Sequence, residues 1–170
     1  MANSITLVTG GQRSGKSAFA EQLTLHRCAS PVYIATARIF DNEMRARVEA
    51  HQQRRGSMWT NHEAPLAPGN LPLESGTVLL DCLTMWATNI LFDENEDLPR
   101  AIERFRVEWR TLADKPLDII AVTNEIGLGG ISANPLQRKF TDLQGMVNQI
   151  VAAEASEMYM LVSGVPLRIK

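Results

Sequence analysis

The sequence predicts an α/β domain with three layers, in which helices cover both faces of a mostly parallel central sheet. Short apolar runs alternate with segments of helical spacing along the 170 residues, and this order implies parallel βαβ units with right-handed crossovers. The apolar runs are also unbroken, as in strands that are buried on both faces. The expected strands are Ile5–Thr9, Pro31–Thr36, Thr77–Asp81, Pro116–Thr123 and one or two within residues 157–170.

The expected helices lie between these runs, at Lys16–Arg27, Asp41–Arg55, the segment after Asp81, Pro99–Ala113, and Asn134 to about Ala155. Asp41 is placed to cap the second of them. Asn134 and Pro135 suit the start of the last helix, because Asn caps well and the first helical position needs no N–H donor. Residues 64–76 hold three prolines and two glycines and therefore predict a loop.

The composition is that of an ordinary globular chain, with 45% hydrophobic and 21% charged residues. A length of 170 residues fits one domain, which we expect to span residues 1–170. The net charge of -2 gives no footprint for nucleic acid or an anionic membrane. The two cysteines, Cys28 and Cys82, lack the spacing of a zinc site or a disulfide framework. Neither a signal peptide nor a membrane span is visible, so the expected location is the cytoplasm.

One motif, GGQRSGKS at Gly10–Ser17, matches the phosphate-binding pattern G-x-x-x-x-G-K-[ST]. Its glycines allow backbone N–H groups to surround phosphate oxygens, and the helix that follows directs the positive end of its dipole at them. Lys16 is expected to reach the β- and γ-phosphates. The alternative is a plain strand–turn–helix junction, but a predicted strand precedes this motif and a predicted helix follows it. The sequence therefore predicts a P-loop domain of the RecA-like kind.

Asp81 ends the apolar run TVLLD. In P-loop proteins an acidic residue at a strand end commonly helps to hold Mg²⁺, and the hydroxyl of Ser17 can ligate the same ion. We therefore expect Ser17 and Asp81 to form the metal site. The alternative is that Asp81 only caps the helix that follows it.

Two further features carry weaker signals. His51 lies on the predicted helix after the second strand and precedes Arg54 and Arg55. A neutral imidazole beside cations and a bound triphosphate could act as a nucleophile towards phosphorus. The segment 123–130, TNEIGLGG, follows a strand and is either a mobile loop over the site or a plain flexible turn.

Five segments form an ordered set along the chain: LVTGGQRSGKSAFAE, YIATARIFDNEMRARVEAHQQRR, LLDCLTMWATNILF, VTNEIGLGG and FTDLQGMVNQIVAAEASEMYMLVSGVPLRIK. This set resembles the bifunctional adenosylcobinamide kinase and adenosylcobinamide-phosphate guanylyltransferase family of cobalamin biosynthesis. The similarity runs from Leu7 to Lys170 and is interrupted mainly at residues 64–76 and 93–117. A P-loop alone is shared by many functions, whereas the ordered set is far more specific.

The resemblance implies a two-step reaction. Enzymes of this family use a nucleoside triphosphate, ATP or GTP, to phosphorylate the aminopropanol hydroxyl of adenosylcobinamide. They then transfer GMP from GTP to that phosphate through a histidine–GMP intermediate, which releases pyrophosphate and forms adenosylcobinamide-GDP. The resemblance implies that the corrinoid adenosylcobinamide is the small-molecule partner. It also implies that the chain forms a homotrimer.

The resemblance also implies roles for single residues. The family's histidine lies seven residues after the methionine of a DxEM turn, which corresponds here to Met44 and His51. His51 and Lys16 are therefore the implied catalytic residues. The implied nucleotide contacts are Gly10, Gly11, Gln12, Arg13, Ser14, Gly15, Lys16, Ser17, Thr36, Ala37, Arg38, Gln52, Gln53, Arg54, Arg55, Glu63 and Asp81. Asp81 stands where the family often has a glutamate, one methylene longer.

Two other functions stay open from the sequence. A GTP-binding switch would use the same P-loop, and the glycine-rich segment after Thr123 would change conformation on hydrolysis. The sequence has no NKxD base-reading motif, which argues against a switch. A simple metabolite kinase would keep the phosphoryl step alone, and release of pyrophosphate would separate it from the two-step enzyme.

Overall fold

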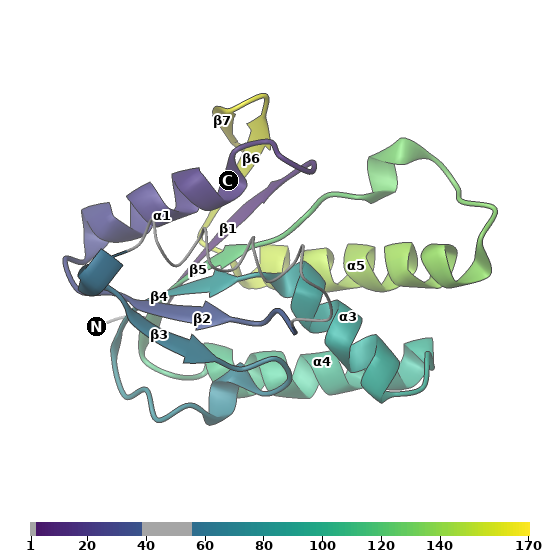
Figure 1. Cartoon of the computed structure of the whole chain (residues 1–170), viewed down its shortest axis with the longest axis horizontal. Helices are drawn as coiled ribbons and strands as arrows, with labels where there is room; N and C mark the ends of the chain where they lie inside the picture. Colours follow the sequence, from purple (N-terminus) through teal and green to yellow (C-terminus); the bar gives the residue numbers. More distant parts are fainter. Residues whose placement is uncertain (1–2, 39–55) are drawn as a thin grey trace.

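A computed structural model describes residues 3–38 and 56–170, so the predicted helix at 41–55 lies outside the described residues. Within them, seven strands form one sheet in the order β3-β2-β4-β5-β1-β6-β7 (Figure 1). Neighbouring strands are parallel except for β6 and β7, which pair antiparallel. The strands are β1 (Ser4–Gly10), β2 (Val32–Ala35), β3 (Thr60–Glu63), β4 (Gly76–Asp81), β5 (Leu117–Val122), β6 (Glu157–Val162) and β7 (Val165–Arg168).

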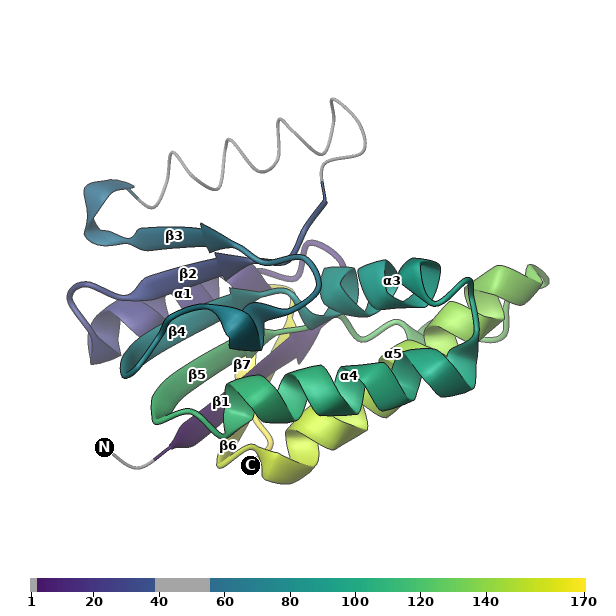
Figure 2. The ribbon, with the colours of Figure 1, turned by 90° about the horizontal axis from the view of Figure 1, so that it is seen from below.

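The helices lie on both faces of this sheet. They are α1 (Lys16–Arg27), α3 (Leu83–Asp93), α4 (Leu98–Ala113) and α5 (Pro135–Glu154), with 3-10 turns at Gly56–Met58, Pro68–Asn70 and Gly127–Gly129. Helix α1 covers one face, and α3, α4 and α5 cover the other (Figure 2). The predicted three-layer α/β class with a mostly parallel sheet is confirmed. None of the helices in the described ranges has the length and hydrophobicity needed to cross a bilayer.

Each face of the sheet contributes to its own hydrophobic core, because successive side chains of a strand point to opposite faces. In β4, Val78 and Leu80 pack with α3, α4 and α5, whereas Leu79 packs on the α1 side. The larger core contains the fully buried Trp86 and Phe105, whose ring centroids are 4.9 Å apart. This two-sided burial explains why the central strands appear in the sequence as unbroken apolar runs.

The starts of the last two helices follow the sequence signals. The Oδ1 of Asn134 accepts hydrogen bonds from the backbone N–H of Leu136 at 2.9 Å and of Gln137 at 3.3 Å, as the predicted cap requires. Helix α4 begins one residue earlier than expected, where Asp97 Oδ1 accepts from the N–H of Arg100 at 3.0 Å. Both helices therefore start at a side-chain cap followed by a proline within the first turn.

Strand β3 was not predicted from the sequence. Its four residues, TNHE, include no apolar side chain, and three of them are exposed at the sheet edge. Backbone pairing with β2 holds it in place, with Thr60 opposite Val32. The preceding Trp59 is buried and packs edge-on against Tyr33, with 6.2 Å between ring centroids. An edge strand of this kind lacks the hydrophobic periodicity by which strands are recognised.

Candidate functional site

The predicted phosphate-binding loop lies at the carboxyl end of β1 and leads into α1 (Figure 1). Ligands of α/β proteins gather at this edge of the sheet. Gly10 and Gly15 have φ angles of 148° and 95°, a region that favours glycine. A Cβ at Gly10 would lie only 2.5 Å from the carbonyl oxygen of Leu161 in β6. The path of the loop therefore requires glycine at both positions, as the motif predicts.

Two segments distant in the sequence support this loop. The turn between β6 and β7 donates a hydrogen bond from the N–H of Gly164 to the carbonyl oxygen of Ser14, at 3.0 Å. The segment that leaves β5 donates from the N–H of Glu125 to the carbonyl oxygen of Gly10, also at 3.0 Å. Both contacts use backbone atoms only, so they could not be predicted from any side-chain motif in the sequence. They fix the loop between its own helix and two neighbouring strands.

Lys16 opens α1, and its side chain folds back over the loop. The Nζ donates to the carbonyl oxygen of Gly11 at 2.5 Å and lies 3.5 Å from the Oγ of Ser14. Only 8% of the residue is exposed. Burial lowers the pKa of the Lys16 ammonium, while the nearby Asp81 acts in the opposite direction. The electrostatic effect of Asp81 on Lys16 means that the loop lysine and the strand-end acid share one site.

Asp81 ends β4 at the same edge of the sheet, and Tyr33 donates a hydrogen bond from its Oη to the Oδ2 of Asp81 at 3.1 Å. The next residue, Cys82, caps α3, because its Sγ accepts from the N–H of Met85 at 3.5 Å. The alternative that Asp81 is the cap is therefore wrong. Desolvation, followed by the charge of Asp81, raises the pKa of the Cys82 thiol to about 12. This thiol stays neutral near pH 7.

Ser17 and Asp81 are both half-buried and offer oxygen atoms to a cation. Within the described ranges, His, Cys, Asp and Glu form no group of three or more that could hold a metal ion. Magnesium in nucleotide sites needs only one or two protein oxygens, because waters and substrate phosphates complete its shell. The donor set of Ser17 and Asp81 therefore fits Mg²⁺ bound together with a nucleotide.

Other implied nucleotide contacts follow the neighbouring strands. Thr36 is fully buried, and its Oγ1 donates to the carbonyl oxygen of Cys82 at 2.7 Å and accepts from the N–H of Cys82 at 2.9 Å. Its hydroxyl thus anchors the residue after Asp81. Arg38 is half-buried, and Glu63 is exposed at the end of β3. Contacts from Thr36, Ala37, Arg38 and Glu63 to a nucleotide remain predictions.

The predicted nucleophile His51 lies outside the described residues, as do Gln52, Gln53, Arg54 and Arg55. The exposed loop residues Gly11, Gln12 and Arg13 are described, and Arg13 has a φ of 57°. Of the predicted site, the structure therefore brings together the P-loop, Lys16 and Asp81.

A buried polar network at the carboxyl end of β5 was not predicted from the sequence. The Oγ1 of Thr123 donates to the Oδ1 of Asn148 at 2.6 Å, and the Nε2 of Gln144 donates to both at 2.9 and 2.8 Å. Next to them, the Oγ1 of Thr84 accepts from the N–H of Asn124 at 2.9 Å. The sequence feature that could have indicated this network is the pair of amides, Gln144 and Asn148, which lie four residues apart on the buried face of the last predicted helix. This network holds the segment that leaves β5 beside the loop.

Comparison with known proteins identifies the family. The family model for cobinamide kinase / cobinamide phosphate guanyltransferase matches residues 6–169. The chain is 38% identical over 185 residues to the bifunctional adenosylcobalamin biosynthesis protein CobU of Escherichia coli (strain K12), covering 96% of this chain and 98% of that protein. It is 37% identical over 185 residues to the CobU of Salmonella typhimurium, with the same coverage. It is also 37% identical over 169 residues to the bifunctional adenosylcobalamin biosynthesis protein CobP of Pseudomonas aeruginosa, covering 96% of each chain. As the ordered set of motifs predicts, the chain belongs to the cobinamide kinase / cobinamide phosphate guanyltransferase family.

Proposed function

We propose that this chain is a bifunctional enzyme that phosphorylates adenosylcobinamide and then transfers GMP from GTP onto the new phosphate. The observation that carries the proposal is a P-loop between β1 and α1, at the same edge of the sheet as the acid that ends β4, in a chain of this family. The relatives are named as bifunctional proteins of adenosylcobalamin biosynthesis. A switch or a single-step kinase is not favoured by these names.

In the phosphoryl step the chain has to hold the triphosphate and spread its charge. The ammonium of Lys16, which lies 2.5 Å from the carbonyl oxygen of Gly11, would exchange that partner for phosphate oxygens. The N–H groups at the start of α1 would donate to the same phosphates. Ser17 and Asp81 would hold Mg²⁺, which when bound neutralises charge on the β- and γ-phosphate oxygens.

In the guanylyl step a neutral nitrogen of His51 would attack the α-phosphorus of GTP. A phosphorus–nitrogen bond forms as the bond to the bridging oxygen breaks, and pyrophosphate leaves with that electron pair. The phosphate of adenosylcobinamide phosphate then attacks the same phosphorus, and the imidazole leaves. Two displacements through a covalent intermediate replace one difficult displacement. The spacing of His51 from Met44 supports this role by resemblance to the family.

Other parts of the proposal rest on the same resemblance. We propose that residues 1–170 act as one catalytic domain, that ATP as well as GTP can serve the first step, and that the enzyme works as a trimer in the cytoplasm. The coverage of 98% of the Escherichia coli relative is consistent with one catalytic unit of this length. The net charge of -2 gives no support for a nucleic-acid partner.

The direct test is product analysis. The purified chain is incubated with Mg²⁺, adenosylcobinamide and either ATP or GTP. The corrinoid products are then separated and identified by mass spectrometry. The expected result is adenosylcobinamide phosphate with either nucleotide, and adenosylcobinamide-GDP with an equal amount of pyrophosphate when GTP is present. Phosphorylation without pyrophosphate would indicate a single-step kinase. Slow GTP hydrolysis with no change in the corrinoid would indicate a switch.

A further inference from the structure

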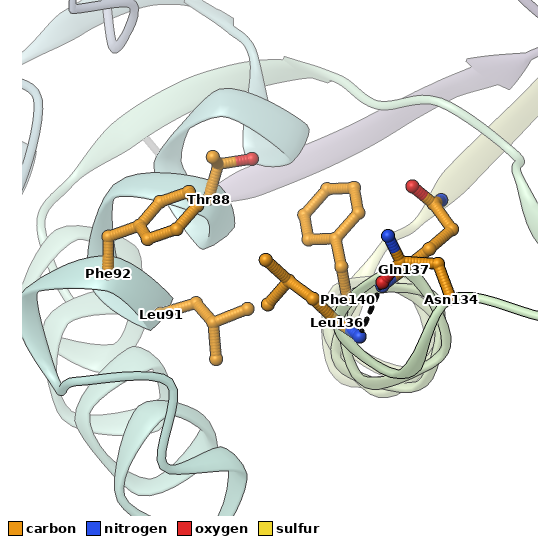
Figure 3. Close-up of a pocket in the computed structure, with 7 residues that line it drawn as sticks. All are labelled: Thr88, Leu91, Phe92, Asn134, Leu136, Gln137 and Phe140. Carbon is orange, nitrogen blue, oxygen red and sulfur yellow. Dashed lines mark hydrogen bonds between the residues drawn. The ribbon is translucent and has the colours of Figure 1, made fainter.

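A pocket lies between α3 and α5, where both helices extend beyond the carboxyl edge of the sheet (Figure 1). Its volume is about 200 Å³, and it is lined by Thr88, Leu91, Phe92, Asn134, Leu136, Gln137 and Phe140. Figure 3 shows Leu91 from α3 facing Leu136 and Phe140 from α5 across the gap. The walls of the pocket are therefore largely apolar.

Several apolar side chains at this end of the molecule are exposed. Phe92 on the pocket wall is 52% exposed. The segment between β5 and α5 carries Leu128 and Ile131, which are 77% and 92% exposed. This segment leads directly into Asn134 at the rim of the pocket. Phe92 therefore extends the apolar wall of the pocket onto the exposed surface, and exposed apolar surface of this kind marks interaction sites.

The rim of the pocket is polar. The side-chain amides of Asn134 and Gln137, both exposed, stand on the first turn of α5, with the hydroxyl of Thr88 opposite on α3. The Oδ1 of Asn134 caps α5 by accepting from two backbone N–H groups, so its Nδ2 is the donor that it presents. The pocket thus combines apolar walls with neutral hydrogen-bonding groups and has no charged residue in its lining.

We infer that this pocket seats one edge of the corrin ring of the acceptor substrate, an inference that rests on the proposed function. A corrin is a flat, apolar macrocycle with primary amides around its edge, and apolar walls with an amide rim complement both features. The volume of about 200 Å³ is below the roughly 300–1,000 Å³ that encloses a whole small ligand. The pocket therefore takes only one edge of the ring.

The distance to the phosphate site suits this placement. Thr88 follows Asp81 by seven residues, six of them in α3. At about 1.5 Å of rise per helical residue, the pocket begins on the order of 10 Å from the strand-end acid. The reacting hydroxyl of adenosylcobinamide stands at the end of a long side chain of the ring. A ring held in the pocket can therefore present that hydroxyl at the nucleotide.

The test compares corrinoid and nucleotide affinities in variants of the full chain. Phe92→Ala and Gln137→Ala are made singly and together, because both residues are exposed and their loss leaves the cores intact. Val107→Ala, which removes an apolar residue of α4 that is 58% exposed and outside the pocket, is the matched control. Adenosylcobinamide is titrated into each protein and followed by its visible absorbance, and KM is measured for the corrinoid and for GTP.

The expected result is a rise of about tenfold or more in both the Kd and the KM of adenosylcobinamide in the double variant. The KM of GTP should stay within about twofold of wild type, as in the control. If the double variant binds the corrinoid as tightly as Val107→Ala does, the inference is wrong, and the proposed function still stands if products form. If gel filtration shows that the double variant changes oligomeric state while its corrinoid affinity is unchanged, the pocket is a subunit contact instead. Failure of the wild type to form products would overturn the proposed function. The titration with adenosylcobinamide tests separately whether the corrinoid binds in the pocket.

Discussion

The Nη2 of Arg27 donates to the Oε2 of Glu157 at 2.8 Å, which ties the last turn of α1 to the first residue of β6. The Nη1 of the same guanidinium donates to Asp118 Oδ1 in β5 at 3.0 Å and to Thr6 Oγ1 in β1 at 3.1 Å. One side chain therefore joins the helix behind the P-loop to three strands. It does so at the amino edge of the sheet, opposite the nucleotide site.

Arg27→Ala should destabilise the fold, because it leaves the half-buried carboxylates of Asp118 and Glu157 without this partner. We expect a loss of about 1–3 kcal/mol in the free energy of unfolding, measured by urea denaturation. Arg168→Ala is the matched control, since its Nη2 is 3.7 Å from Glu157 and its side chain is 60% exposed. The control should change stability by at most about 0.5 kcal/mol. Equal losses in the two variants would contradict this role of Arg27.

Gly10→Ala should weaken both nucleotide binding and stability. The new Cβ would lie 2.5 Å from the carbonyl oxygen of Leu161 in a backbone conformation that favours glycine, so the loop or β6 has to move. We expect a loss of about 1–3 kcal/mol in stability and at least a tenfold rise in the Kd of GTP, measured by calorimetry. Gly145→Ala is the control. A Cβ there meets no described atom within 4 Å, and alanine in α5 should stabilise by about 0.5–1 kcal/mol. Normal GTP binding by Gly10→Ala would refute the requirement for glycine.

GTP binding should become pH-dependent through Lys16. Burial lowers the pKa of its ammonium from 10.5, and phosphate oxygens raise it again because they favour the charged form. The pKa of Lys16 is therefore lower in the free protein than in the complex with GTP. At a pH between these two values, GTP binding is accompanied by uptake of a proton, and the affinity for GTP falls as the pH rises. Calorimetry in two alkaline buffers of different ionisation enthalpy measures this uptake. Lys16→Met should bind GTP weakly without proton uptake at any pH, and equal uptake by wild type and variant would exclude Lys16 as its source.

Asp81→Asn should reduce turnover and raise the Mg²⁺ concentration needed for half-maximal rate. The amide keeps the size of the side chain but removes the charge that would face the ion, and we expect a loss of about a hundredfold or more in kcat. Tyr33→Phe removes the hydroxyl that donates to Asp81 at 3.1 Å but keeps the carboxylate, and it should lower kcat by less than about tenfold. Both rates are measured across a Mg²⁺ titration. An unchanged Mg²⁺ dependence in Asp81→Asn would place the ion elsewhere.

The central part of the fold could be predicted because its signals are local. The P-loop, the apolar runs of β1, β4 and β5, and the Asn134 cap are each formed by residues that lie within a few positions of one another in the sequence. Other features depend on contacts between distant segments. The need for glycine at position 10 comes from Leu161 in β6, and the support of the loop by Gly164 uses backbone atoms alone. Such contacts leave no pattern in the neighbouring sequence.

The polar parts of the site were the hardest to predict. Strand β3 is an exposed edge strand, so burial leaves no periodicity in it. Thr123 and Asn148 form a buried pair across 25 positions, and a single sequence does not show which polar residues pair. The role proposed for His51 rests on resemblance to the family, because a histidine beside two arginines is also typical of a solvated helix.

The central claim, covalent transfer through His51, is tested most directly by labelling. Wild type and His51→Ala are incubated with Mg²⁺ and GTP labelled at the α-phosphate, in the absence of corrinoid, and GTP binding is measured in parallel. The prediction is that wild type acquires label that is lost in acid and kept in base, with release of pyrophosphate, and that His51→Ala binds GTP but acquires none. If the variant labels as wild type does, or if wild type binds GTP without acquiring label, the histidine–GMP mechanism is wrong for this chain.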